Sequence, residues 1–143
     1  MTCAVSSGQL DQLRRVFHRT PLKNTYGLEL SFVDGRAVFD MPYNAAFDNA
    51  FGGIHGGVFA TLMDYAAWFT IATKYKSCVV TVDVHIQLLE RVERVNLRAS
   101  AEIVRAGQRL AVARMHVSTD AGRVVAVGTG TFAVTSTPLT ALS

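Results

Sequence analysis

Residues 56–74, GGVFATLMDYAAWFTIATK, decide the fold of this chain. The apolar run from Val58 to Thr73 is 16 residues long, and Asp64 near its middle is its only charged residue. A membrane-spanning helix needs about 20 apolar residues, and a carboxylate at mid-bilayer is costly. The apolar side chains fall on every side of a helical wheel, which is typical of a helix buried all round. The sequence therefore predicts a long core helix over this stretch.

Alternating apolar and polar residues predict strands on both sides of this helix. Upstream, Tyr26–Val33 and Arg36–Met41 flank an Asp34-Gly35 hairpin turn. Downstream, tight turns join the segments, which favours an antiparallel meander. Its strands are expected near Val80–Gln87, Val95–Ile103, Leu110–Val117 and Arg123–Val134, with Val80, Val82, Val84 and Ile86 on one face of the first. The total is about six strands.

The two ends of the chain are expected to lie outside this sheet. A short helix is predicted within residues 1–20, and Thr20-Pro21 would stop it. The Ser/Thr-rich tail, residues 135–143, is expected to be loose. Gly128 and Gly130 fall on one face of the last strand, where a helix could approach closely.

Together these elements predict an α+β fold in a single domain, residues 1–143, with its core at about residues 26–134. A sheet that curls around the long helix would bury most of it. A second copy of the chain would close the face that remains. The fold therefore predicts a homodimer.

Charge and cysteine content narrow the class of protein. The net charge is +3, from 14 Lys and Arg against 11 Asp and Glu, which is below the usual balance of a dedicated DNA-binding protein. It suits an ordinary surface or a site for an anionic small ligand. Cys3 and Cys78 show no metal-ligand spacing, and residues 1–8 show no signal peptide. We expect a reduced, cytoplasmic protein without a metal and without nucleic-acid or membrane partners.

Two features of the long helix point to chemistry. Gly56-Gly57 stands where the loop becomes the helix, and a helix N-terminus with unpaired N–H groups suits an anion or a developing oxyanion. The alternative is that these glycines serve only the turn. Asp64 is expected to be buried, which would raise its pKa and suit a general base or a nucleophile. The alternative is a structural carboxylate bonded to a neighbouring hydroxyl or to backbone.

The spacing of these features bears on the assembly of the site. Gly56 and Asp64 are eight residues apart, which is about 12 Å along a helix. One reacting carbonyl cannot easily touch both on the same helix. If both act on one substrate, they come from two antiparallel helices of a dimer, and the site is shared across the two-fold axis.

The pattern Asn49…His55-Gly56-Gly57…Asp64 resembles the signature of hotdog-fold acyl-CoA thioesterases. It is similar to the phenylacetate-pathway (PaaI-like) branch of the 4-hydroxybenzoyl-CoA thioesterase superfamily. The order of hairpin, loop, long helix and strands also matches, over about residues 26–134. The resemblance implies a hotdog fold, in which the curved sheet wraps around the long helix.

The resemblance also implies a role for each residue of the pattern. Asp64 would be the catalytic carboxylate, as general base or nucleophile. The Gly56 N–H of the partner subunit would polarise the thioester carbonyl. Asn49 would contact the thioester or the attacking water, and His55 would shape the loop and hydrogen-bond nearby. Thr81, on the strand after the helix, would assist Asp64.

Further residues are candidates for binding the substrate. Trp68 falls on the same helical stripe as Asp64, so it either lines and limits an acyl pocket or packs in the core. Phe47 likewise either lines the acyl pocket or packs in the core. Gly57 would let a ligand approach the backbone. Basic residues of similar enzymes meet the coenzyme A phosphates, for which Arg105 and Arg109 are candidates here. A solvated charged surface is the alternative for these arginines.

The sequence therefore predicts a thioesterase that hydrolyses an aromatic or short- to medium-chain acyl-CoA to the free acid and CoA. It would need no cofactor, since coenzyme A is part of the substrate. The family adds a dimer of dimers, a homotetramer, to the predicted dimer. Two alternatives remain open: a non-catalytic acyl-CoA-binding protein, and a hotdog hydratase or dehydratase. The latter usually pairs a histidine with an acid, whereas His55 is about 14 Å from Asp64 along the helix.

Overall fold

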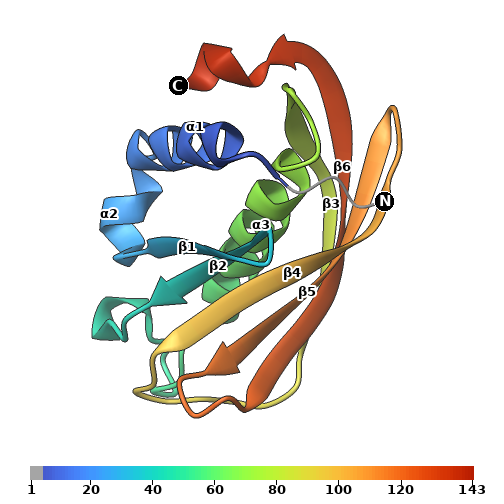
Figure 1. Ribbon diagram of the computed structural model, residues 1–143. Coiled ribbons are helices and arrows are strands. Elements are labelled where there is room, and N and C mark those ends of the chain that lie inside the picture. Colours follow the sequence, from blue (N-terminus) through green and yellow to red (C-terminus); the bar gives the residue numbers. More distant parts are fainter. Residues whose placement is uncertain (1–4) are drawn as a thin grey trace.

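A computed structural model describes residues 5–143 of the chain, so Cys3 lies outside the described residues (Figure 1). The predicted α+β arrangement of six strands, one long helix and a short N-terminal helix is confirmed. The elements are α1 (Ser7–His18), α2 (Leu22–Tyr26), β1 (Glu29–Val33), β2 (Arg36–Met41), η1 (Ala45–Phe47), α3 (Gly56–Ala72), β3 (Ser77–Leu88), β4 (Leu97–Ala106), β5 (Leu110–Thr119), β6 (Val124–Pro138) and η2 (Leu139–Leu142).

The six strands form one antiparallel sheet in the order β1-β2-β4-β5-β6-β3, which curves around α3 (Figure 1). The predicted meander is correct for β4, β5 and β6. It is wrong for β3, which pairs with β6 and forms an edge of the sheet. The chain leaves that edge, crosses through residues 89–96 and returns as β4 beside β2. This crossover brings the segment 89–96 past the loop that precedes α3.

The sheet buries most of α3 but not all of it. Leu62, Met63, Ala66, Ala67 and Ile71 have no exposed surface. One line of residues, spaced four, three and four apart, stays half-buried or exposed: Gly57, Thr61, Asp64 and Trp68, here called the open stripe. One chain therefore leaves part of the helix uncovered, as expected for a sheet curved over a helix, and the cover by a second copy stays a prediction. Residues 5–143 contain no helix long and apolar enough to cross a membrane.

A β-bulge in β3 changes which of its residues face α3. Thr81 pairs with Phe132 and Asp83 with Thr131, so Val82 is an extra residue on the bulged strand. The bulge shifts the alternation by one position. Val80 and Val82 are 50% and 58% exposed. They do not share a buried face with Val84 and Ile86, which corrects the expected alternation.

The C-terminal tail is ordered as far as η2, contrary to the expectation of a loose segment. β6 continues to Pro138, and Leu139 is 1% exposed. The Leu139 N–H donates to the Lys76 carbonyl at 2.8 Å, and the Thr135 hydroxyl donates to the Cys78 carbonyl at 2.8 Å. These bonds extend the β3–β6 pairing beyond the predicted end of the strand.

Gly128 and Gly130 allow a close approach, but their close neighbours are not in α3. A Cβ at Gly128 would lie 2.4 Å from the His85 carbonyl oxygen, which belongs to β3. A Cβ at Gly130 would lie 2.9 Å from the Phe132 ring. The expected helix contact is therefore wrong, and Gly128 serves the pairing of β6 with the bulged strand β3.

Replacing Gly128 by alanine should force β3 and β6 apart, because the new methyl group meets backbone rather than a mobile side chain. We expect the free energy of unfolding in a denaturant titration to fall by about 1–3 kcal/mol. Gly8→Ala is the matched control, since a Cβ there meets no atom of residues 5–143 within 4 Å and alanine favours the helix. Equal stability of Gly128→Ala and the unchanged protein would contradict the close approach.

Candidate active site

The loop before α3 is closed on itself around Asn49. The Asn49 Oδ1 accepts hydrogen bonds from the Phe51 N–H at 2.9 Å and the Gly53 N–H at 3.3 Å. The Asn49 N–H donates to the Gly53 carbonyl at 2.8 Å. Within residues 5–143 the Asn49 Nδ2 amide donates to no protein acceptor. Asn49 therefore builds the loop with its carbonyl and presents its amide as the group able to meet a ligand.

Arg91 covers this loop from the crossover segment, a contact that the sequence did not indicate. Its guanidinium donates to the Phe51 carbonyl and forms an ion pair with Glu93. A Cβ at Gly53 would lie 3.0 Å from the Arg91 side chain. The only feature of the sequence that points to this contact is Gly52-Gly53. Two glycines allow a close neighbour but do not indicate which residue it is. Arg91 and the loop lie at the end of the sheet where α3 begins.

His55 is the N-cap of α3 and leaves one backbone donor free. Its Nδ1 accepts from the Gly57 N–H at 2.8 Å, so this ring nitrogen carries no proton in the capped state. The Val58 N–H donates to the His55 carbonyl at 3.0 Å. Among the described residues, the Gly56 N–H has no acceptor. The positive end of the helix dipole thus presents the Gly56 N–H to an incoming group, while the Gly57 N–H is already used.

Asp64 lies half-buried on the open stripe and is held by Thr81. The Thr81 hydroxyl donates to the Asp64 Oδ1 at 2.8 Å. Burial raises the pKa of the Asp64 carboxyl above its ordinary value, and the Thr81 hydrogen bond partly opposes this rise in pKa. The structure therefore brings together Asp64 and Thr81, as the resemblance implied. The chemical roles of the two side chains stay predictions.

Aromatic side chains lie beside Thr61 and at the C-terminal end of the open stripe. The rings of Tyr26 and Phe47 stack with centroids 4.5 Å apart, and the Tyr26 hydroxyl lies 3.4 Å from the Thr61 hydroxyl. At the other end, the Trp68 Nε1 donates to the Val79 carbonyl at 2.7 Å. Phe47 and Trp68 thus stand on either side of Asp64, and both are half-buried.

One chain does not bring all the predicted site residues together. Gly56 and Asp64 stay about 12 Å apart on one helix. Arg105 and Arg109 line a hollow at the turn between β4 and β5. The Tyr75 hydroxyl donates to the Gly107 carbonyl at 2.8 Å, which places this turn beside the C-terminal end of α3 (Figure 1). The two arginines therefore lie at the opposite end of α3 from Gly56.

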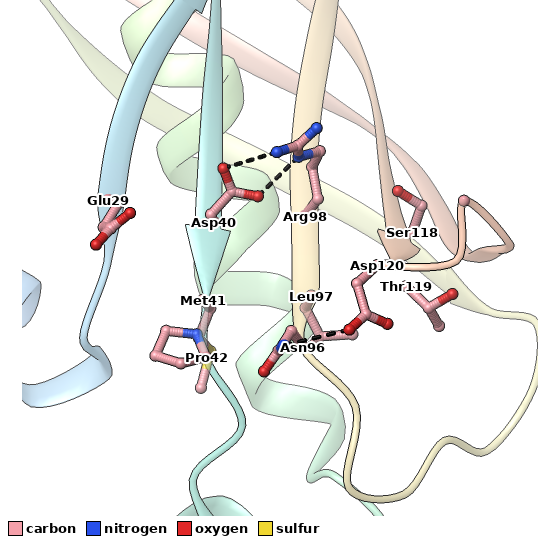
Figure 2. A pocket seen from close by; sticks show the side chains of 11 residues that line it. Glu29, Asp40, Met41, Pro42, Asn96, Leu97, Arg98, Ser118, Thr119 and Asp120 are labelled. Carbon is pink, nitrogen blue, oxygen red and sulfur yellow. Dashed lines mark hydrogen bonds and ion pairs between the residues drawn. The ribbon is translucent and has the colours of Figure 1, made fainter.

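A second hollow lies where β2 ends beside β4 and contains none of the predicted site residues (Figure 2). Its Arg98 donates to both carboxylate oxygens of Asp40, at 2.7 and 3.0 Å. The Asn96 Nδ2 donates to the Asp120 Oδ2 at 3.2 Å. These groups bind one another, and Asp64 and Gly56 lie elsewhere, on the open stripe and at the start of α3.

Comparison with known proteins places the chain in a family. The sequence pattern of the thioesterase superfamily matches residues 51–126. A Halobacterium salinarum protein, provisionally named an esterase, is 33% identical over 114 residues, which cover 71% of this chain and 75% of that protein. The chain belongs to the thioesterase superfamily, as the resemblance in its sequence indicated.

Solved structures confirm the hotdog fold. The E. coli PaaI protein from the phenylacetic acid degradation operon superposes with a TM-score of 0.87, covering 94% of this chain and 98% of that one. The two sequences are 19% identical, so this likeness shows the fold alone. The Bacillus halodurans protein BH2602, crystallised with CoA, gives a TM-score of 0.76 at 27% identity and covers 94% of this chain and 98% of that one.

Asp64→Asn should stabilise the protein at neutral pH. Because burial raises the pKa of Asp64, ionisation is less favourable in the folded chain than in the unfolded chain. Stability is therefore lost as pH rises from the unfolded pKa, about 3.9, through the raised folded pKa. Asparagine does not ionise and still accepts from Thr81, so we expect a higher melting temperature than wild type at pH 7.

The same melting experiment at pH 3 provides the control for this prediction. There Asp64 is protonated in both states, and the advantage of Asp64→Asn should shrink or disappear. Asp11→Asn, which changes an exposed carboxylate paired with Arg14, should give no comparable gain at pH 7. An Asp64→Asn protein less stable than wild type at pH 7 would contradict the raised pKa.

Proposed function

We propose that this protein is an acyl-CoA thioesterase that hydrolyses an aromatic or short- to medium-chain acyl-CoA to the free acid and CoA. The observation that carries the proposal is the half-buried Asp64, held by Thr81 on an otherwise apolar helix. The Gly56 N–H at the start of the same helix, which has no acceptor among residues 5–143, supplies the complementary donor. The CoA bound to the Bacillus halodurans neighbour supports this class of ligand.

The proposed reaction uses the ionised Asp64. As a general base, it takes a proton from water while the water oxygen attacks the thioester carbonyl. As a nucleophile, it attacks the carbonyl itself and forms an anhydride that water then hydrolyses. In both cases the C–S bond breaks, the CoA thiolate takes up a proton, and the acid is released. The Gly56 N–H donates to the carbonyl oxygen as negative charge develops there.

The reaction requires two copies of the chain. Asp64 and Gly56 of one α3 are about 12 Å apart, so an antiparallel partner helix would bring its Gly56 to Asp64. The apolar surface that such a pairing would cover lies on the edge strand β3, at Val80 and Val82. A long exposed apolar edge is a template for pairing with another strand. We therefore propose a homodimer with two shared sites, and a dimer of dimers stays a prediction from the family.

The remaining candidates fit around this centre. Asn49 would turn its free Nδ2 amide toward the thioester or the attacking water, and His55 would keep the loop and Gly56 in place. The hollow at Arg105 and Arg109 would meet the CoA phosphates of the shared site that includes the Gly56 of the partner subunit, because it lies at the opposite end of α3 from the Gly56 of its own chain. The proposed reaction uses no metal and no cofactor besides the CoA of the substrate, and a cytoplasmic location stays an expectation.

The proposal predicts that purified protein releases thiol from some members of a panel of acyl-CoAs. The panel runs from acetyl through medium and long chains and includes phenylacetyl and benzoyl. Because Asp64 acts on the reacting atoms, Asp64→Asn should lose roughly a hundredfold or more in kcat/KM. Asp11→Asn is the matched control and should keep the wild-type rate, since Asp11 is an exposed residue of α1.

The outcomes of this assay separate the alternatives. Binding of acyl-CoA without thiol release would replace the enzyme by an acyl-CoA-binding protein. Hydration of an enoyl-CoA with the thioester intact would indicate a hydratase. Equal hydrolysis by wild type and Asp64→Asn would leave the fold standing and remove Asp64 from the mechanism.

Val82→Asp should weaken the dimer and the activity together, because it places a charge on the apolar edge of β3. Sedimentation should show a shift toward monomer, and the specific activity should rise again with protein concentration. Val33→Asp is the matched control, since Val33 is 55% exposed on the other edge strand, β1. A fully active monomer would contradict the shared site.

A further inference from the structure

The open stripe on α3 has two unlike ends. On the N-terminal side of Asp64, the stripe carries the small residues Thr61 and Gly57. On the C-terminal side it carries Trp68, the only tryptophan of the chain. Within one chain, a group bound over Asp64 therefore has small residues on one side and an indole on the other.

The Trp68 side chain is held in place rather than free to swing. Its Nε1 donates to the Val79 carbonyl of β3 at 2.7 Å. Its ring packs on Phe69 with centroids 4.9 Å apart and a tilt of 60°. Rotation of the indole would break a part-buried hydrogen bond and leave the Val79 carbonyl without this donor. Trp68 is therefore a fixed wall joining α3 to β3, the same strand that supplies Thr81.

The position of this wall limits what lies beside Asp64. Trp68 follows Asp64 by four residues, so it stands on the same face of the helix about 6 Å further along. A chain that extends from a carbonyl at Asp64 toward the end of α3 meets the indole within about the length of one six-membered ring. At the other end, the Tyr26–Phe47 stack borders the stripe next to Thr61.

We infer that Trp68 sets the upper size of the acyl group, and that the preferred acyl group is a single aromatic ring or a short chain lying against the indole. This inference rests on the proposed thioesterase function and adds its specificity-determining residue. An acyl chain longer than the space before the indole has no room to extend along the stripe. An aromatic ring fits the same space and gains contact with the indole face.

The kinetic test compares Trp68→Ala with Trp68→Phe and wild type on phenylacetyl-, hexanoyl- and decanoyl-CoA. Removing the wall should raise the ratio of kcat/KM for decanoyl-CoA over phenylacetyl-CoA roughly tenfold or more. Trp68→Phe keeps an aromatic ring at this position, so its ratio of kcat/KM values should stay near that of wild type, although the hydrogen bond to Val79 is lost. An equal fall of kcat/KM on all three substrates in Trp68→Ala would overturn the inference, because a merely structural residue would behave in that way.

A binding experiment tests the same wall without turnover. In an Asp64→Asn background, the fluorescence of the single tryptophan reports on its surroundings directly. Hexanoyl-CoA and phenylacetyl-CoA should change the emission, and CoA alone should not. The same emission change with CoA alone as with the acyl-CoAs would overturn the inference.

The two proposals fail in different ways. If wild type releases no thiol but Trp68 emission responds only to acylated CoA, the proposed hydrolysis is wrong, and the proposed contact between Trp68 and the acyl group is kept. If wild type hydrolyses the panel but Trp68→Ala keeps the wild-type substrate profile, Trp68 does not limit the size of the acyl group, and the proposed hydrolysis is kept. Should Trp68→Ala not fold, the emission of the Asp64→Asn protein decides.

Discussion

Burial of α3 is the constraint on which the rest of the structure depends. A helix with apolar residues on every side cannot stay in water, and the strands supply the cover by curving around it. The same requirement places β3 at the edge of the sheet beside β6, where it packs against α3 and extends the cover of the helix. Gly128 makes this pairing possible, since any side chain there would meet the backbone of β3.

What the sheet leaves uncovered is where the polar chemistry of α3 lies. The open stripe holds Asp64, the one charged residue of the helix. Asp64 is half-buried, so burial raises its pKa while part of the side chain stays accessible. Thr81, next to the bulge at Val82, donates to that carboxylate. At the start of the helix, His55 accepts from the Gly57 N–H, and no acceptor within residues 5–143 binds the Gly56 N–H. Packing and the proposed chemistry thus depend on the same few residues.

Local rules predicted the parts of this molecule whose causes lie within a few residues. The apolar run indicated α3, Asp34-Gly35 indicated the first hairpin, and the resemblance placed Thr81 near Asp64. The edge position of β3, the phase shift at Val82 and the cover of the loop by Arg91 were missed. Each of these depends on contacts between segments far apart in the chain, which no local pattern encodes.

The amino-acid sequence was enough to predict one apolar helix with a central carboxylate and a sheet that wraps it, because periodicity and hydrophobic burial act at short range. Its loop motif also indicated the thioesterase superfamily. The packing of the folded chain sets which line of α3 stays open, and it brings the Trp68 Nε1 to the Val79 carbonyl. It alone placed Arg105 and Arg109 far from the Gly56 of their own chain. These outcomes follow from strand order and sheet curvature, which arise when distant segments compete to cover the same helix.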